Sequence, residues 1–131
     1  MSEPIWPGLE SALVDTGIFI LWYRGDPKAR LFFRNRRIFY YSKVTRKELL
    51  RRPISSSERY RILKLLGTMR VINPEPQVAS AYDDLLNRYP YLQNHLADAL
   101  IAASALAKNL TLVTTNVRHF QPILEIDIVP F

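Results

Sequence analysis

The 131-residue chain contains no cysteine, which excludes disulfide frameworks and cysteine-based zinc sites and suits a reducing compartment. It also lacks a long apolar run, since no stretch reaches the roughly 18 consecutive apolar residues of a membrane span. Residues 1–10 have neither the basic start nor the apolar segment of a signal peptide. We therefore expect a cytoplasmic protein that does not associate with membranes.

Acidic residues are the minority among the charged side chains, with 12 against 18 lysines and arginines and a net charge of +6. Fourteen of the 18 basic residues, but only three acids, fall between Arg24 and Lys64. Arginine predominates there, and its planar guanidinium suits phosphate groups. The stretch is either a solvated basic surface or a binding surface for a polyanion, and we favour a polyanion, with nucleic acid first.

Segments rich in strand-forming residues alternate with segments of helical spacing along the chain. Strands are predicted at residues 11–15, 37–42, 69–73, 110–116 and 126–131. Helices are predicted at 17–23, 27–35, 55–67, 78–89 and 91–109, the last with Asn94 as its cap. A further helix is predicted through 47–52 with Ser42 or Thr45 as its cap, and a short turn is expected at 116–120. This alternation predicts one α/β domain over 11–131, after an arm at 1–10, with a parallel sheet of four to five strands.

Polar side chains follow the ends of predicted strands, where open α/β sheets bind their ligands. Asp15 follows the first strand and Asn116 the fourth, while Glu48 and Asp98 lie early in predicted helices. Like charges that converge persist only with protons or cations between them. Oxygen ligands without cysteine favour Mg²⁺ or Mn²⁺ over zinc.

Each of these residues also has a purely structural interpretation. Asp15 is suited to cap the following helix, and Asn116 is an ordinary turn former. Glu48 has Arg51 and Arg52 at helical spacing, and Asp98 suits the positive end of a helix dipole. The order of the four residues along an α/β pattern is stronger evidence than any one of them.

Three segments then identify a family resemblance: ALVDT at 12–16, SKVTRKELL at 42–50 and DALIAASALAKNLTLVTTN at 98–116, followed by Phe120. Together they resemble the PIN domain, and within it the VapC-type ribonuclease toxins of toxin–antitoxin pairs. The resemblance implies a three-layer α/β/α sandwich that binds Mg²⁺ or Mn²⁺ and cleaves RNA. By position, Asp15, Glu48 and Asp98 match the metal-binding acids, and Asn116 completes the catalytic set.

The resemblance also assigns supporting roles. Thr16 and Thr114 match hydroxyl residues that orient carboxylates or water. His119 stands where the family often has a further acid, which favours one-metal chemistry. It is either a phosphate-binding or proton-carrying group or a surface turn histidine.

The resemblance further implies in-line attack by an activated water, which leaves a 3′-hydroxyl and a 5′-phosphate. Six arginines are expected to hold the RNA backbone: Arg34, Arg36, Arg37, Arg46, Arg51 and Arg52. The implied partners are a second copy of the chain, in a homodimer, and a cognate antitoxin. The alternative is a degenerate PIN-like module that binds RNA or a protein without cleavage.

Overall fold

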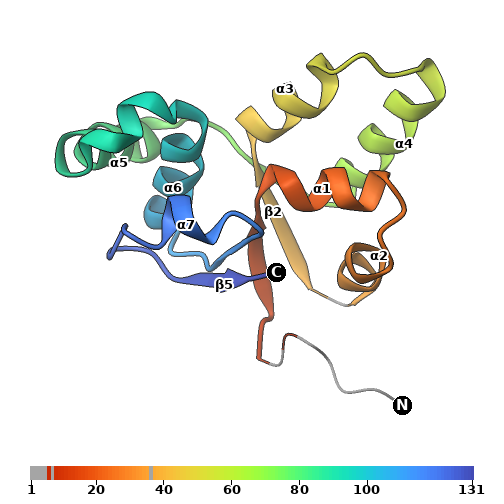
Figure 1. The fold of residues 1–131 in the computed structure, drawn as a ribbon, viewed down its shortest axis with the longest axis horizontal. Coiled ribbons are helices and arrows are strands. Elements are labelled where there is room, and N and C mark those ends of the chain that lie inside the picture. The colour runs from red at the N-terminus through yellow and green to blue at the C-terminus, as the bar shows by residue number, and fades with distance from the viewer. Residues whose placement is uncertain (1–5, 7, 36) are drawn as a thin grey trace.

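Five parallel strands form the centre of the molecule, in the order β3-β2-β1-β4-β5 (Figure 1). The computed structural model describes residues 6, 8–35 and 37–131. The strands are β1 (Ser11–Val14), β2 (Ile38–Ser42), β3 (Arg70–Ile72), β4 (Leu112–Thr114) and β5 (Ile128–Pro130). The predicted parallel sheet is confirmed, at the upper end of the expected strand number.

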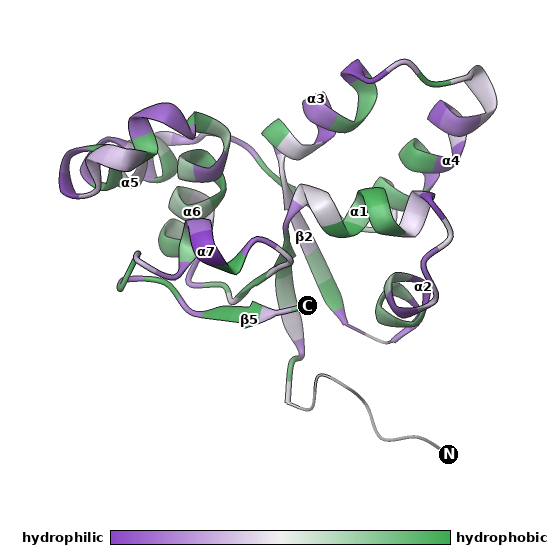
Figure 2. Cartoon of the chain, in the orientation of Figure 1, coloured by the Kyte–Doolittle hydropathy of each residue, from purple (hydrophilic) through white to green (hydrophobic). Residues whose placement is uncertain are grey.

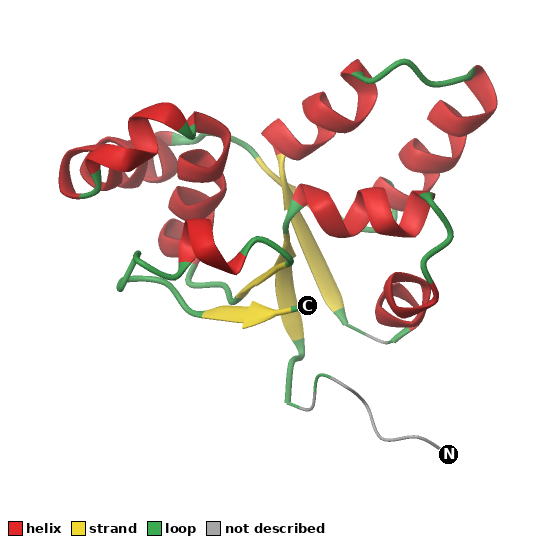
Figure 3. Ribbon diagram, in the orientation of Figure 1, coloured by secondary structure: helices red, strands yellow, loops and turns green. Residues whose placement is uncertain are grey.

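Helices cover both faces of this sheet (Figures 1 and 3). One layer holds α1 (Thr16–Tyr23), α2 (Pro27–Arg34), α3 (Lys43–Arg51) and α4 (Ser56–Leu66). The other holds α5 (Pro76–Arg88), the 3₁₀ segment η1 (Pro90–Asn94), α6 (Leu96–Lys108) and the short α7 (Val117–Phe120). The predicted three-layer α/β/α sandwich is therefore the observed architecture. None of the helices in the described part of the chain is long and apolar enough to cross a membrane.

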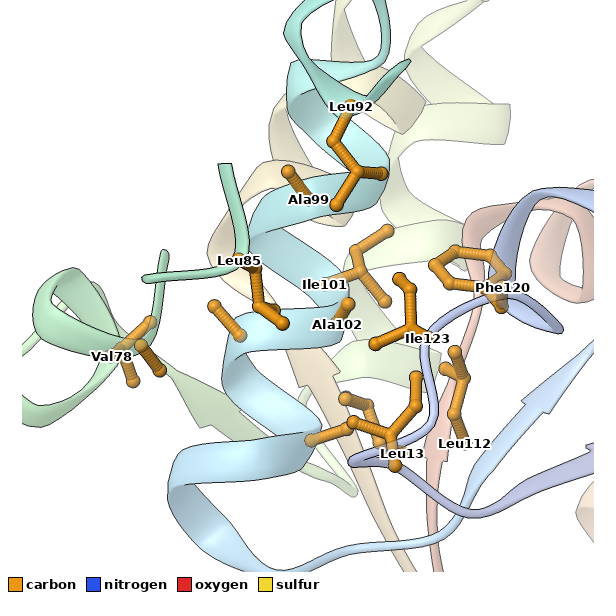
Figure 4. Packing of buried hydrophobic residues seen from close by; sticks show 14 of the residues in the cluster. Leu13, Val78, Leu85, Leu92, Ala99, Ile101, Ala102, Leu112, Phe120 and Ile123 are labelled. Carbon is orange, nitrogen blue, oxygen red and sulfur yellow. The ribbon is translucent and has the colours of Figure 1, made fainter. Parts of the chain in front are cut away.

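Strand residues alternate between two hydrophobic cores, as the period of two in a β-strand requires. Leu13 and Leu112 point into the core beneath α5 and α6, while Val14 and Val113 point into the core beneath α1, α2 and α4. Figure 4 shows the first core, where Leu13, Leu112 and Phe120 gather against α6. Strands β1 and β4 thus each join the two helical layers.

Small side chains let α6 lie close to the sheet, since Ala99, Ala102, Ala103 and Ala105 are all buried. The helix is apolar along most of its length, whereas the short α7 beside it combines a hydrophilic and a hydrophobic part (Figure 2). The prediction that Asn94 caps this helix is wrong. Residues Pro90–Asn94 form a separate 3₁₀ turn, so the backbone enters α6 at His95, which has no side-chain cap bond.

The segment before β1 packs on the α2 side of the sheet. The Trp6 ring is buried, lies 4.7 Å from the Phe32 ring in an edge-on arrangement and stacks on Phe131 at 5.5 Å. Residues 1–5 and 7 of the predicted arm lie outside the described residues. The division between an arm at 1–10 and a domain at 11–131 stays a prediction.

Candidate active site

The polar residues singled out in the sequence gather at the carboxyl edge of the sheet. Asp15 directly follows β1 and is the N-cap of α1, and Thr114 is the last residue of the neighbouring β4. The first turn of α1 approaches the segment after β4 closely at Gly17, where an added Cβ would lie 2.9 Å from the Thr115 hydroxyl. A glycine at this position therefore allows α1 to begin beside β4.

Two hydrogen bonds fix the buried carboxylate of Asp15, which is only 6% exposed. Its Oδ1 accepts from the Thr16 backbone N–H at 2.8 Å, and its Oδ2 accepts from the Thr114 hydroxyl at 2.7 Å. Thr114 in turn accepts from the Asn116 backbone N–H at 2.8 Å. Asp15 thus caps α1, as its structural interpretation held, and also faces the polar edge of the sheet.

Glu48 is tied to the same edge through Thr16. The Thr16 hydroxyl donates to Glu48 Oε1 at 2.9 Å and lies 2.8 Å from the hydroxyl of buried Thr45. Since Thr16 gives its proton to Glu48, Thr45 is the donor to Thr16. Thr16 therefore binds both acids, Asp15 through its backbone and Glu48 through its side chain.

Sequence reasoning missed Thr45 as part of this network. The signal was present, because residues three apart share one face of a helix, and α3 carries Thr45 and Glu48 at that spacing. Among the described residues, neither Arg51 nor Arg52 forms a salt bridge with Glu48. The structural alternative for Glu48 is thus not what the fold adopts.

Asp98 enters the site from the first turn of α6 and contacts α7. Its Oδ2 lies 2.7 Å from Nδ1 of His119, a nitrogen that is also 2.6 Å from Nδ2 of Asn116. His119 is therefore bound to the acid of α6 rather than to solvent alone. The rings of His119 and His95 have their centroids 4.4 Å apart.

His95 is the second residue that sequence reasoning missed. It lies three positions before Asp98, a spacing that places both on one side of the turn that starts α6. The spacing was therefore available in the sequence, but the contact of His95 with His119 from α7 was not, because it depends on how α7 packs against α6.

Burial and repulsion together raise the pKa of the Asp15 carboxyl above its ordinary value of 3.8. Desolvation is the largest cause, and the charges of Asp98 and Glu48 add to it. The hydrogen bonds from Thr114 and Thr16 act in the opposite direction. A cation between the three carboxylates would relieve this repulsion.

The three acids nevertheless do not form the tightest cluster. Among the described residues, the one group of three or more side chains close enough for a single directly bound ion is His95, Asp98 and His119, whose ligand atoms lie within 4.8 Å of one another. Asp15 and Glu48 lie farther out in the same charged neighbourhood.

The arginines expected to hold the RNA backbone divide into two groups at opposite ends of β2. Arg34 is exposed at the end of α2, and Arg37 directly precedes β2, so both belong to the amino edge of the sheet. Arg37 donates to the backbone carbonyls of Leu9 at 2.7 Å and Trp6 at 3.0 Å, and burial lowers its pKa. Arg36 lies outside the described residues.

The second arginine group follows the carboxyl end of β2, in the helix that carries Glu48. Arg46 and Arg51 are exposed on α3. Arg52 is half-buried with its guanidinium 5.5 Å from the centre of the Tyr23 ring. Only this group lies at the same edge of the sheet as the acids.

The structure is thus a parallel α/β/α sandwich with buried and half-buried acids at the carboxyl edge of its sheet, where open α/β sheets bind their ligands. Residues 12–122 match the PIN domain family. Ribonuclease VapC10 of Mycobacterium tuberculosis is 34% identical over 113 residues, which cover 82% of this chain and 84% of the relative. The chain belongs to the PIN domain family and resembles its VapC-type members.

Solved structures agree with this assignment. A toxin–antitoxin complex from Klebsiella pneumoniae contains a chain 27% identical to this one, with a TM-score of 0.76 over 90% of this chain and 95% of that chain. VapBC2 from Rickettsia felis, bound to a fragment of promoter DNA, shares the fold at 19% identity, with a TM-score of 0.74 over 92% of this chain and 98% of that chain.

Proposed function

We propose that the chain is a divalent-metal-dependent endoribonuclease and the toxin of a VapBC-type toxin–antitoxin pair. The observation that carries the proposal is the carboxylate of Asp15. It is buried at the strand edge, fixed by Thr114 and Thr16, and repelled by Asp98 and Glu48. A fold gains nothing in stability from such repulsion, so a cation-dependent function is the physical reason for it.

The residues at this edge fit Mg²⁺ or Mn²⁺. Asp15, Glu48 and Asp98 offer hard oxygen ligands, and each Asp15 oxygen keeps a lone pair beyond its hydrogen bond. Mg²⁺ keeps several of its waters, so carboxylates too far apart for direct coordination by all three can hold it partly through water. When bound, such an ion supplies Lewis-acid activation of water and of a phosphoryl oxygen.

The chain's own groups then position the reaction. Asp15 and Asp98 would hold the cation, while Glu48, oriented by the Thr16 hydroxyl, would add a further oxygen ligand or take the proton of the attacking water. His119 contacts Asp98 from α7, and Asn116, the N-cap of α7, contacts His119; we propose that both bind the scissile phosphate. In-line displacement leaves a 3′-hydroxyl and a 5′-phosphate.

The RNA backbone lies along α3 in this proposal. Arg46 and Arg51 are exposed on the helix that carries Glu48, so a strand bound to them reaches the acids. Arg34 and Arg37 lie at the opposite edge of the sheet. A contact of these two with RNA requires a substrate that extends around the sheet.

The proposed partners follow from the relatives. The solved neighbours named above come from VapBC and toxin–antitoxin complexes, which supports a cognate antitoxin for this chain. A homodimer is proposed on the same family basis. The proposed substrate, cellular RNA, places the protein in the cytoplasm.

One observation favours a second function, a PIN-like module that binds RNA without cleaving it. His119 stands where a further acid is common in the family, and its Nδ1 engages Asp98 at 2.7 Å. That contact competes with a cation for the Asp98 carboxylate.

Cleavage of total cellular RNA by the purified chain, with Mg²⁺, Mn²⁺ or EDTA, separates the two functions. We expect discrete fragments that require the metal and disappear in Asp98→Asn, because this variant loses a charged ligand and keeps its shape. Asp83→Asn, an exposed acid of α5, is the matched control and retains cleavage. Full activity in Asp98→Asn would refute the site, and RNA bound but uncut with every metal would support the binding module.

A further inference from the structure

Both histidines of the chain meet at one place in the fold, beside Asp98. His95 ends the turn before α6, and His119 comes from α7 after β4. The two rings are 4.4 Å apart between centroids, and one ligand atom from each of the three side chains lies within 4.8 Å of the others.

The surrounding structure holds these side chains in place and leaves them accessible. The Tyr91 hydroxyl donates to the His119 backbone carbonyl at 2.5 Å, which fastens α7 to the segment that leads into α6. The His119 side chain is 37% exposed and that of Asp98 is 20% exposed. Within the described part of the chain, the His95 imidazole has no hydrogen-bond partner, so its nitrogens are available to a ligand.

We propose that His95, Asp98 and His119 form a site for a borderline divalent transition ion, with Zn²⁺ as its representative. Two neutral imidazoles and one carboxylate are ligands of zinc-type ions, and three protein ligands leave a coordination position open. Mg²⁺ takes oxygen ligands, so it does not prefer this set. The site thus differs in chemistry from the oxygen-only surroundings of Asp15 and Glu48.

Direct binding of one ion requires a small rearrangement of the three side chains. Ligands at about 2.1 Å from a tetrahedral ion lie about 3.4 Å apart. The Nδ1–Oδ2 separation of His119 and Asp98 is 2.7 Å, and the widest separation in the cluster is below 4.8 Å. The His119–Asp98 pair must therefore widen by about 0.7 Å, and the widest pair must shorten by at most about 1.4 Å, which rotation of the side chains, above all of the unbonded His95 ring, can supply.

The local charge also favours a cation. The N-terminus of α6 carries a partial positive charge of roughly half a unit, which opposes binding. The full negative charge of Asp98 outweighs it, and Asp15 is close enough for its pKa to respond to Asp98.

Asp98 belongs both to this zinc site and to the proposed nuclease site, so zinc binding is expected to affect cleavage if the proposed function holds. An ion held by the two histidines occupies the carboxylate needed at the oxygen-only site. Zn²⁺ is therefore expected to inhibit cleavage supported by Mg²⁺, and removal of His95 is expected to weaken that inhibition.

Titration of the untagged protein with Zn²⁺ by isothermal calorimetry tests the site without reference to activity. We expect one Zn²⁺ per chain, weakened at least about tenfold in His95→Gln and in His119→Gln. Asp83→Asn, which removes an exposed carboxylate elsewhere, is expected to bind within about twofold of the original chain. Because the chain has two histidines, the imidazole ¹⁵N NMR spectrum reports both, and both are expected to shift with Zn²⁺.

Zn²⁺ binding unchanged in His95→Gln, or no binding by the original chain, overturns the proposal. If His119→Gln does not fold, His95→Gln decides alone, since its side chain supports no hydrogen bond among the described residues. Zinc binding through the histidines without RNA cleavage under any metal overturns the proposed nuclease and leaves the zinc site standing. Cleavage with Mg²⁺ together with an absence of zinc binding overturns the zinc site and leaves the proposed nuclease standing.

Discussion

Replacing Asp15 with Asn is expected to stabilise the metal-free protein at neutral pH while it removes activity. The raised pKa of Asp15 means that the folded chain binds this proton more tightly than the unfolded chain. Stability contributed at this position is therefore present below the ordinary pKa of 3.8 and is lost as the pH rises through the raised value. Asn is neutral at every pH and also a good N-cap, so it avoids the loss.

The size of the effect follows from two opposing contributions. Each unit of raised pKa corresponds to about 1.4 kcal/mol of penalty on the charged form. The amide of Asn acts in the opposite direction. It has one oxygen where the carboxylate has two, so one of the hydrogen bonds from Thr16 and Thr114 is lost, which costs about 1 kcal/mol. We expect a net gain near pH 7.5, and each kcal/mol of that gain raises Tm by about 4 °C for a chain of this length.

Urea unfolding in EDTA, from about pH 7.5 down to about pH 4.5, measures this difference. The advantage of Asp15→Asn is expected to shrink as the pH falls, because Asp15 of the original chain becomes protonated in the folded state. Adding Mg²⁺ at ten times its Kd is expected to stabilise the original chain by about 1.4 kcal/mol and the variant by less. Asp83→Asn, on the exposed face of α5, controls for loss of an acid.

A variant that is less stable than the original chain, by the same amount at every pH in EDTA, would refute the reasoning. The hydrogen bonds to the Asp15 carboxylate of the original chain would then outweigh the cost of its burial and repulsion, and its raised pKa would have no energetic consequence. Equal stabilisation of both proteins by Mg²⁺ would place the ion away from Asp15.

Two further predictions concern RNA binding and the core. In an Asp98→Asn background, Arg46→Ala and Arg51→Ala are expected to weaken RNA binding, measured by fluorescence anisotropy. Each lost phosphate contact is expected to lower the slope of log affinity against log salt concentration by about 0.7. Arg34→Ala is expected to change neither quantity, and an equal effect at Arg34 would contradict the division of the arginines. Phe120 is fully buried where α7 meets α6, so Phe120→Ala is expected to cost about 3–5 kcal/mol in urea unfolding, and a loss below about 1 kcal/mol would contradict its place in the core.

The local sequence pattern was sufficient to predict the two strands that position the site. Strand-forming residues ending in Asp15 and in the Thr114–Asn116 segment predicted β1 and β4 and the edge at which they meet, because parallel strands end on the same side of a sheet. Glu48 was ambiguous, since α3 offers arginines at helical spacing. Only the contact with Thr16, 32 residues earlier, decides its partner.

The sequence by itself determined the alternation of strands and helices, and with it the sheet and the acids at its carboxyl edge, because periodicity and caps are local properties. Tertiary structure alone decided which distant side chains meet. It brought His119 to Asp98 and His95, and it placed Arg37 at the opposite edge from Arg46. The break in helical geometry before α6 also depends on packing, since η1 is fastened to α7 through Tyr91. Such contacts depend on how separate elements pack in space, which sequence spacing does not encode.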